Sequence, residues 1–251
     1  QRFTITWSNT ISLTQNGSTS TYKYGFISVK VVKGALEITT SLNLHDEYLW
    51  GISEVSSAWP AAALEAQVIA SRSYAASKLG PISTSCDCNV YSHISDQNFV
   101  GYSKESEPRI GKLWREAVIR TNIDTFTSLA ILQNGKPIQA YYSSSSGGAT
   151  QSTLDAWGTP TRYTQSVIDS ASVDVALNPR FASWKASSSQ ALVSTAFGLP
   201  DVLTLEIISR NQAGAVTSIK ATSSTGATKI LRGDTFRSRA KLPSAWFSLA
   251  N

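Results

Sequence analysis

Methionine is absent from this 251-residue chain, and cysteine occurs only twice. Because the chain starts at Gln1 and lacks an initiator methionine, we expect a processed or trimmed mature form. Charged residues make up 16%, fewer than in most cytosolic proteins. No stretch approaches the roughly 18 to 20 uninterrupted apolar residues that a membrane-spanning helix needs. We therefore expect no membrane span in this chain.

Glycine and proline, at 15 and 8 residues, are too scarce for a fibrous or low-complexity protein. Hydrophobic residues make up 41%, including seven Trp, nine Tyr and eight Phe, which excludes a disordered chain. The length suits one large domain or two small ones. Since no repeat or linker is evident, we expect a single domain over residues 1–251.

The net charge of +5 indicates either an acidic partner or only good solubility. Nucleic acid, anionic lipid and an anionic cell-wall polymer are the candidate partners. The tightest basic grouping, residues 232–241, includes an aspartate and lacks the interleaved aromatic residues of a single-strand binder. We therefore predict no nucleic-acid binding.

Two regions have the alternation typical of β-strands. Residues 1–40 contain β-branched and aromatic runs, with Asn16-Gly17 and Lys33-Gly34 at hairpin turns. Residues 203–238 also read as an antiparallel meander, and Asn134-Gly135 marks a further hairpin.

Helical patterns separate these regions. Asp46 caps a short helix in "DEYLWGIS", and Pro60 starts an Ala-rich helix that Gly80-Pro81 stops. Shorter helices are expected in "IGKLWREAVIRT" and "SSSQALVSTAF". Residues 82–110 lack periodicity, which is typical of a functional region. The predicted fold class is α+β, with antiparallel β-meanders around the central Ala-rich helix and a long irregular substrate-cleft region.

Cys86 and Cys88 stand seven and five residues before His93, and they leave three alternatives open. A disulfide between them closes a small ring, unlike an ordinary structural staple. A zinc site formed by Cys86, Cys88 and His93 has three ligands and an open fourth position, although the spacing is not that of a standard zinc finger. Free or externally paired thiols are the third alternative.

Glu54 lies between two predicted helices and beside Val55 and Trp59. An apolar environment would make it a general acid or base, while the alternative is a loop residue or a helix cap. The "SSSSGGATQS" segment lacks the lysine of a phosphate loop, so nucleotide binding is not expected. Its hydroxyl groups suit either a sugar or peptide ligand or a mobile surface loop.

Four segments in order resemble the stage II sporulation protein D (SpoIID)/LytB family, whose members act on bacterial peptidoglycan. They are "YLWGISEVSSAWPAAALEAQVIASRSYA", "SDQNFVGY", "KPIQAYYSSSSGGAT" and "LRGDTFRSRAKLPSAWF". The first is the most specific, with its Tyr-Leu-x-Gly lead, its Glu, a Trp-Pro and a helix ending in Arg-x-Tyr. The resemblance covers about residues 24–247.

The resemblance implies that Glu54 is the catalytic acid/base of a peptidoglycan lytic transglycosylase. Such an enzyme cleaves the β-1,4 bond between N-acetylmuramic acid (MurNAc) and N-acetylglucosamine (GlcNAc), and leaves a 1,6-anhydro-MurNAc end. Because the sugar's own 6-hydroxyl replaces water, one carboxyl group suffices.

Other matched residues fit a glycan groove, where rings stack on sugars and polar groups bond their edges. The predicted substrate-binding residues are Arg72, Gln97, Tyr142, Ser144, Gly147 and Gly148. Arg72 lies about 18 Å along the helix axis from Pro60, so organising the core is its alternative role. Some family members look like zinc proteins through residues in the region of Cys86, Cys88 and His93, while others have no metal. We expect no required cofactor, with zinc as the one candidate.

Two other functions are alternatives to catalysis. LytB-type relatives are described as enhancers of a separate N-acetylmuramoyl-L-alanine amidase, and a glycan-binding module of the cell wall would not cut at all. The expected partners are peptidoglycan glycan strands and, in the first alternative, a cell-wall amidase. All these functions imply an extracytoplasmic location, either secreted or associated with the cell wall.

Overall fold

The computed structural model describes residues 2–250 and forms two compact units, divided between Tyr142 and Ser143. Both helices and antiparallel sheets are present, which confirms the α+β class. The single domain expected over residues 1–251 stays a prediction. Within residues 2–250, no helix combines the length and apolar character needed to cross a bilayer.

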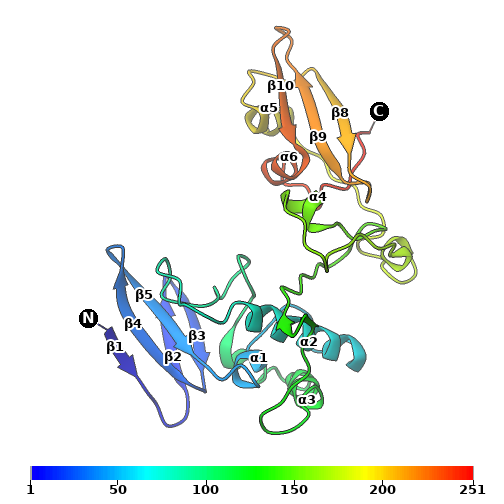
Figure 1. Ribbon diagram of the computed structural model, residues 1–251. Helices are drawn as coiled ribbons and strands as arrows, with labels where there is room; N and C mark the ends of the chain where they lie inside the picture. The colour runs from blue at the N-terminus through cyan, green and yellow to red at the C-terminus, as the bar shows by residue number, and fades with distance from the viewer. Residues whose placement is uncertain (1, 251) are drawn as a thin grey trace. The chain divides into compact units, whose positions relative to one another are not determined.

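The first unit begins with five strands (Figure 1). They are β1 (Arg2–Ile5), β2 (Ile11–Gln15), β3 (Ser18–Tyr22), β4 (Phe26–Val32) and β5 (Ala35–Ser41). One antiparallel sheet has the order β1-β4-β5, and β2 and β3 form a separate hairpin. Because β1 pairs with β4 and not with β2, this sheet does not follow the chain order of a simple meander.

The three predicted hairpin turns are confirmed. They join β2 to β3, β4 to β5, and the short strands β6 (Leu132–Gln133) and β7 (Lys136–Pro137). In each turn both central residues have positive φ, as at Asn16 (51°) and Gly17 (80°). A type I′ turn requires this conformation, and Asn-Gly adopts it readily.

The helices of the first unit follow the predicted pattern. Asp46 caps α1 (Glu47–Trp50) by accepting a hydrogen bond from the Glu47 N–H. The Ala-rich helix is α2 (Ala61–Ser77), and α3 (Gly111–Arg120) is the next long helix. Between them, the irregular region contains one short 3-10 helix, η1 (Gly101–Ser103).

The core of the first unit lies where α1, α2 and α3 meet. Its members are fully buried or nearly so, and they are Leu49, Ile52, Leu64, Val68, Trp114, Ala117 and Val118. Trp114 is 0% exposed, and its indole N–H donates to the Leu49 carbonyl at 2.8 Å. This bond ties α3 to the C-terminal end of α1, directly before the segment that contains Glu54.

The second unit contains the second predicted meander. Its sheet has the order β10-β9-β8, and its helices are short (Figure 1). The elements are α4 (Thr153–Trp157), η2 (Ser170–Val173), α5 (Gln190–Phe197), β8 (Thr204–Arg210), β9 (Val216–Thr222), β10 (Thr228–Arg232) and α6 (Gly233–Arg239). Rings of Phe197, Phe236 and Phe247 pack in its core.

One boundary in the second unit differs from the sequence prediction. The last strand ends at Arg232, and the following "GDTFRSR" forms α6 instead of continuing the meander. Gly233 permits this turn, since a Cβ atom there would lie 1.7 Å from the Val216 carbonyl oxygen. The helix α4, which Ser152 caps, was also not predicted.

Replacing Trp114 with Ala should destabilise the first unit by about 3–5 kcal/mol, because it leaves a large cavity and an unpaired Leu49 carbonyl. The exposed Trp59, which is 49% accessible, provides the control. Urea unfolding followed by circular dichroism measures both variants. Equal losses in Trp114→Ala and Trp59→Ala would contradict this description of the core.

Candidate active site

Glu54 follows a short antiparallel pairing between two segments that are far apart in the sequence. Ile52 and Phe99 form a β-bridge. The Ser53 N–H donates to the Asn98 carbonyl at 2.8 Å, and the Asn98 side-chain amide donates to the Ser53 carbonyl at 2.8 Å. The backbone on the N-terminal side of Glu54 is therefore held by both the main chain and the side chain of Asn98.

Gly51 makes this pairing sterically feasible. A Cβ atom at position 51 would lie 2.2 Å from Cε2 of Phe99, so any other residue would displace that ring. The Phe99 ring also stacks on the Tyr48 ring, with centroids 5.6 Å apart and an angle of 2° between the planes. Packing of the Phe99 ring against the backbone therefore explains the glycine in the Tyr-Leu-x-Gly motif.

The Glu54 carboxylate accepts two hydrogen bonds at one oxygen. Its Oε1 accepts from the Asn98 backbone N–H at 2.7 Å and from the Tyr142 hydroxyl at 3.0 Å. Neither bond uses Oε2, so this second oxygen is the one that can give and take a proton. Glu54 itself is half-buried.

The direction of the Tyr142 bond follows from its neighbours. The Tyr48 hydroxyl donates to Oε1 of Gln97 at 2.7 Å, so the Gln97 amide nitrogen faces Tyr142 and donates to its hydroxyl oxygen at 3.0 Å. The Tyr142 proton is then left for Glu54. Gln97 is 0% exposed, and its hydrogen bonds to the Tyr48 and Tyr142 hydroxyls orient the donor to Glu54.

The phenol groups of Tyr48 and Tyr142 both stay protonated at neutral pH. Burial is the main reason that the pKa of Tyr142 is raised to about 12, and the negative charge of Glu54 adds to it while the Gln97 bond opposes it. Burial also raises the pKa of Tyr48 far above its usual value. Each hydroxyl therefore remains a hydrogen-bond donor.

Glu54 opens onto a depression that also contains a second carboxylate, Glu107, and the ammonium group of Lys104. We call this surface the Glu54 depression. The Lys104 ammonium donates to the Val55 carbonyl at 2.7 Å, and Glu107 accepts from the Ser57 hydroxyl at 3.0 Å. Burial lowers the pKa of Lys104, and Glu107 opposes this. Sequence reasoning missed Glu107 because 53 residues separate it from Glu54 without any local motif.

Arg72, a predicted substrate-binding residue, has its hydrogen bonds within the protein. The guanidinium donates to the Leu129 carbonyl at 2.9 Å and to the side chains of Thr121 and Asn122 at 3.0 Å. It is 4% exposed, and burial lowers its pKa to about 10. This arrangement favours the alternative role, in which Arg72 organises the core.

The predicted residues Ser144, Gly147 and Gly148 lie in the second unit. Ser144 is exposed. Gly147 packs against Trp246, and the Gly148 N–H donates to the Ser172 hydroxyl at 2.8 Å. Of the predicted site residues, the first unit brings together Glu54, Gln97 and Tyr142.

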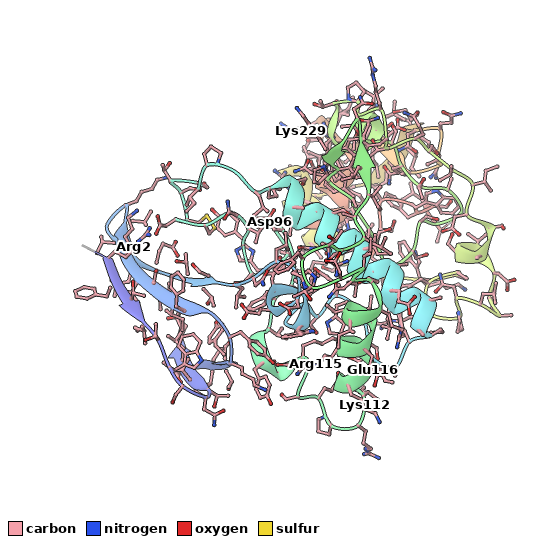
Figure 2. All side chains as sticks on the ribbon, turned by 60° about the horizontal axis from the view of Figure 1, so that its bottom comes forward. Arg2, Asp96, Lys112, Arg115, Glu116 and Lys229 are labelled. Carbon is pink, nitrogen blue, oxygen red and sulfur yellow. A yellow bond between two sulfur atoms is a disulfide. The ribbon has the colours of Figure 1, made fainter. Side chains whose placement is uncertain are left out.

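Cys86 and Cys88 form a disulfide, one of the alternatives that the sequence left open. It is drawn in yellow in Figure 2. A disulfide sulfur is not a thiolate ligand, so Cys86, Cys88 and His93 do not fit a zinc site in this form. Within residues 2–250, no group of three or more His, Cys, Asp or Glu side chains is arranged to hold a metal ion.

The residue between the two cysteines attaches this loop to the first sheet. Asp87 pairs with Lys30 at 2.8 Å and with Arg2, which is labelled in Figure 2. The Lys30 bond lowers the pKa of Asp87. The loop is thereby fixed to β1 and β4.

Comparison with known families agrees with the resemblance seen in the sequence. Residues 33–127 match the model of the SpoIID family, described as Stage II sporulation protein. This segment is similar to the SpoIID domain. It includes Glu54, Arg72, Gln97 and the cysteine loop, and it supports a function related to the bacterial cell wall. Tyr142 and the residues of the second unit lie beyond the matched range, and no curated protein matches the chain.

The raised pKa of Tyr142 predicts a loss of stability in alkali. Its stabilising contribution is complete below about pH 10, the usual phenol value, and it disappears as the pH rises through about 12. Phenolate absorbance and circular dichroism, compared between the native chain and Tyr142→Phe, measure this. Ionisation of Tyr142 near pH 10 would contradict it.

Proposed function

We propose that the first unit is a peptidoglycan lytic transglycosylase with Glu54 as its acid/base. The observation that carries the proposal is the carboxylate itself: Oε1 is held by two donors, while the second oxygen is left to exchange a proton beside an open depression. The match to the SpoIID family supports the substrate, the peptidoglycan glycan strand.

The proposed reaction uses the same carboxyl group twice. Protonated Glu54 gives its proton to the glycosidic oxygen, the C1–O4 bond breaks, and the bonding electrons leave with the GlcNAc oxygen. The Glu54 carboxylate then takes the proton of the 6-hydroxyl as that oxygen bonds to C1. A 1,6-anhydro-MurNAc end forms, Glu54 is protonated again, and no water is consumed.

The neighbours of Glu54 have defined parts in this cycle. The Asn98 N–H and the Tyr142 hydroxyl hold Oε1 in place and stabilise the carboxylate that forms when the proton leaves. Gln97 and Tyr48 orient Tyr142 before the reaction, so little reorganisation is needed during it. In this proposal, Gln97 is a positioning residue, not the substrate ligand predicted from sequence.

Glu107 favours one competing function, an ordinary hydrolase. Hydrolytic glycosidases use two carboxyl groups, and the Glu54 depression contains two. The Glu107 carboxylate is bonded to Ser57, which supports a role in fixing the turn after Glu54. The two functions differ in their products, because hydrolysis leaves reducing ends.

The test is mass spectrometry of products from intact peptidoglycan and from peptide-free glycan strands. The native chain should release anhydro-MurNAc products. Glu54→Gln should lower their release at least ~100-fold, the usual effect of removing a general acid. Glu107→Gln, the matched control from the same depression, should retain activity within about tenfold.

Other results would favour a different function. Reducing ends that require both carboxylates would replace the transglycosylase with a hydrolase. No cleavage with intact wall binding would favour the amidase enhancer or the glycan-binding module. Circular dichroism of each variant confirms that it is folded.

Tyr142→Phe should lower kcat about tenfold and leave KM nearly unchanged, because it removes one charge-assisted hydrogen bond to the reacting carboxylate. Tyr141→Phe, which removes a neighbouring hydroxyl that donates to Gln139, is the matched control. Steady-state release of anhydro products gives both parameters. An equal effect of the two substitutions would contradict a specific role for Tyr142.

A further inference from the structure

Lys104 is a buried cation that the proposed reaction does not use. It lies in the wall of the Glu54 depression, yet it is only 4% exposed. Among residues 2–250, no carboxylate forms an ion pair with its ammonium group. Burying a charge without an ion pair is costly, so stability alone does not account for a lysine at this position.

The Lys104 ammonium holds the main chain directly after Glu54. It donates to the Val55 carbonyl at 2.7 Å. Within the described residues, no hydrogen bond between main-chain groups involves the N–H or the carbonyl of Glu54 or Val55. On the N-terminal side of Glu54, both main-chain groups of Ser53 bond to Asn98. Lys104 is therefore the counterpart of Asn98 on the C-terminal side.

Lys104 belongs to a short helical turn, residues 101–107. The Lys104 N–H donates to the Gly101 carbonyl at 3.4 Å, and the Ser106 N–H donates to the Tyr102 carbonyl at 3.1 Å. Side chains three residues apart in such a turn lie on the same side. The Glu107 side chain accordingly bonds to the same loop as Lys104, two residues further along.

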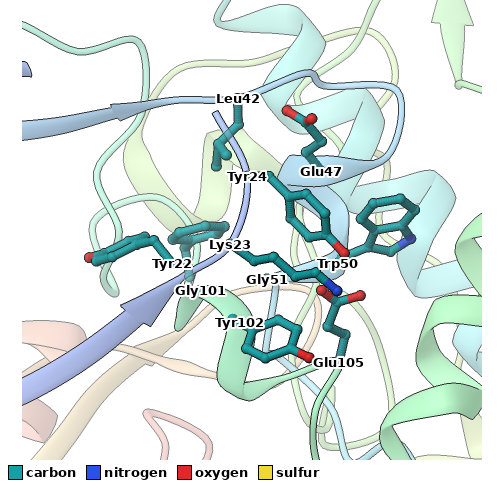
Figure 3. Close-up of a pocket in the computed structure, with 11 residues that line it drawn as sticks. Tyr22, Lys23, Tyr24, Leu42, Glu47, Trp50, Gly51, Gly101, Tyr102 and Glu105 are labelled. Atoms are coloured by element: carbon teal, nitrogen blue, oxygen red, sulfur yellow. The ribbon is translucent and has the colours of Figure 1, made fainter. Parts of the chain in front are cut away.

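Glu105 anchors this turn to the rest of the first unit. Its side chain is 2% exposed, it pairs with Arg115 of α3 at 2.9 Å, and a hydrogen bond from Tyr24 also reaches it. Figure 3 shows Glu105 together with Tyr24 and Tyr102. Lys104 therefore acts on the Glu54 loop from a fixed base.

We propose that Lys104 is a positioning residue for Glu54. By fixing the Val55 carbonyl, its ammonium keeps the carboxylate in the orientation in which Oε1 accepts from the Asn98 N–H and Oε2 is left for proton transfer. This inference rests on the proposed function for the reaction that Lys104 serves. Its hold on Glu54 is measured separately, without any substrate.

The kinetic test uses Lys104→Met, which keeps an unbranched side chain but removes the charged donor. It should lower kcat for release of anhydro-MurNAc products about tenfold and change KM less than about twofold, because a displaced acid/base slows the reaction without weakening substrate binding. Lys104→Arg, which retains a charged donor, should restore kcat to within about threefold. Lys112→Met, at an exposed position of α3, is the matched control and should leave both parameters unchanged.

Amide hydrogen exchange, followed by NMR, measures the hold on Glu54 directly. The Asn98 N–H donates to Glu54 Oε1 at 2.7 Å, so its exchange rate reports whether the carboxylate stays in place. In Lys104→Met this amide should exchange at least ~10-fold faster, while amides within α2 keep their rates. The urea midpoint should stay the same or rise, because an apolar side chain replaces a buried cation.

Three results would overturn this inference. The first is native kcat with native Asn98 exchange in Lys104→Met. The second is a lower urea midpoint with faster exchange throughout the first unit, which would make Lys104 a general stabilising residue. The third is a higher KM at unchanged kcat, which would make it a substrate ligand. If Lys104→Met does not fold, Lys104→Gln is measured in its place and should show the same changes in kcat and in Asn98 exchange.

The outcomes separate this inference from the proposed function. Faster Asn98 exchange in Lys104→Met, in a chain that forms no anhydro products, would remove the proposed function and leave the hold of Lys104 on Glu54. Anhydro products released with equal kcat by the native chain and by Lys104→Met would do the reverse.

Discussion

The pairing of residues 51–53 with residues 98–100 is the interaction on which the rest of the first unit depends. It joins the end of α1 to the irregular region about 45 residues later. Glu54 directly follows the segment 51–53, and Gln97 directly precedes the segment 98–100. If the pairing opened, Glu54 would lose the hydrogen bond from the Asn98 N–H.

Buried polar groups maintain this arrangement. Gln97 and Arg72 are 0% and 4% exposed, and each bonds to several partners within the unit. Lys104 is also 4% exposed and holds the carbonyl directly after Glu54. Burying such groups contributes little net stability, but an unpaired alternative arrangement would be costly. They therefore favour one conformation of the loop that contains Glu54.

The sequence could predict what depends on neighbouring residues. Asn-Gly turns, the Asp46 cap and the limits of α2 follow from local preferences, and the structure confirms them. Glu54 was identified from a family resemblance, since composition alone did not distinguish it from a loop residue.

Contacts between distant segments could not be predicted in this way. The pairing of β1 with β4, the presence of Glu107 beside the Glu54 depression and the Tyr48–Gln97–Tyr142 chain all depend on tertiary packing. Cys86 and Cys88 were compatible with several states, because spacing does not decide between thiolate and disulfide. Gly51 was recognised as part of a motif. The reason that a glycine is needed there is the close approach of the Phe99 ring, which lies 48 residues away in the sequence.

The central claim is that Glu54 supports cleavage without water. Digestion of peptide-free glycan strands in water enriched in oxygen-18, with mass spectrometry of the new chain ends, tests it most directly. A muramidase that hydrolyses the same bond serves as the positive control. This account predicts anhydro-MurNAc ends that contain no oxygen-18. One oxygen-18 atom at each new reducing end would contradict it.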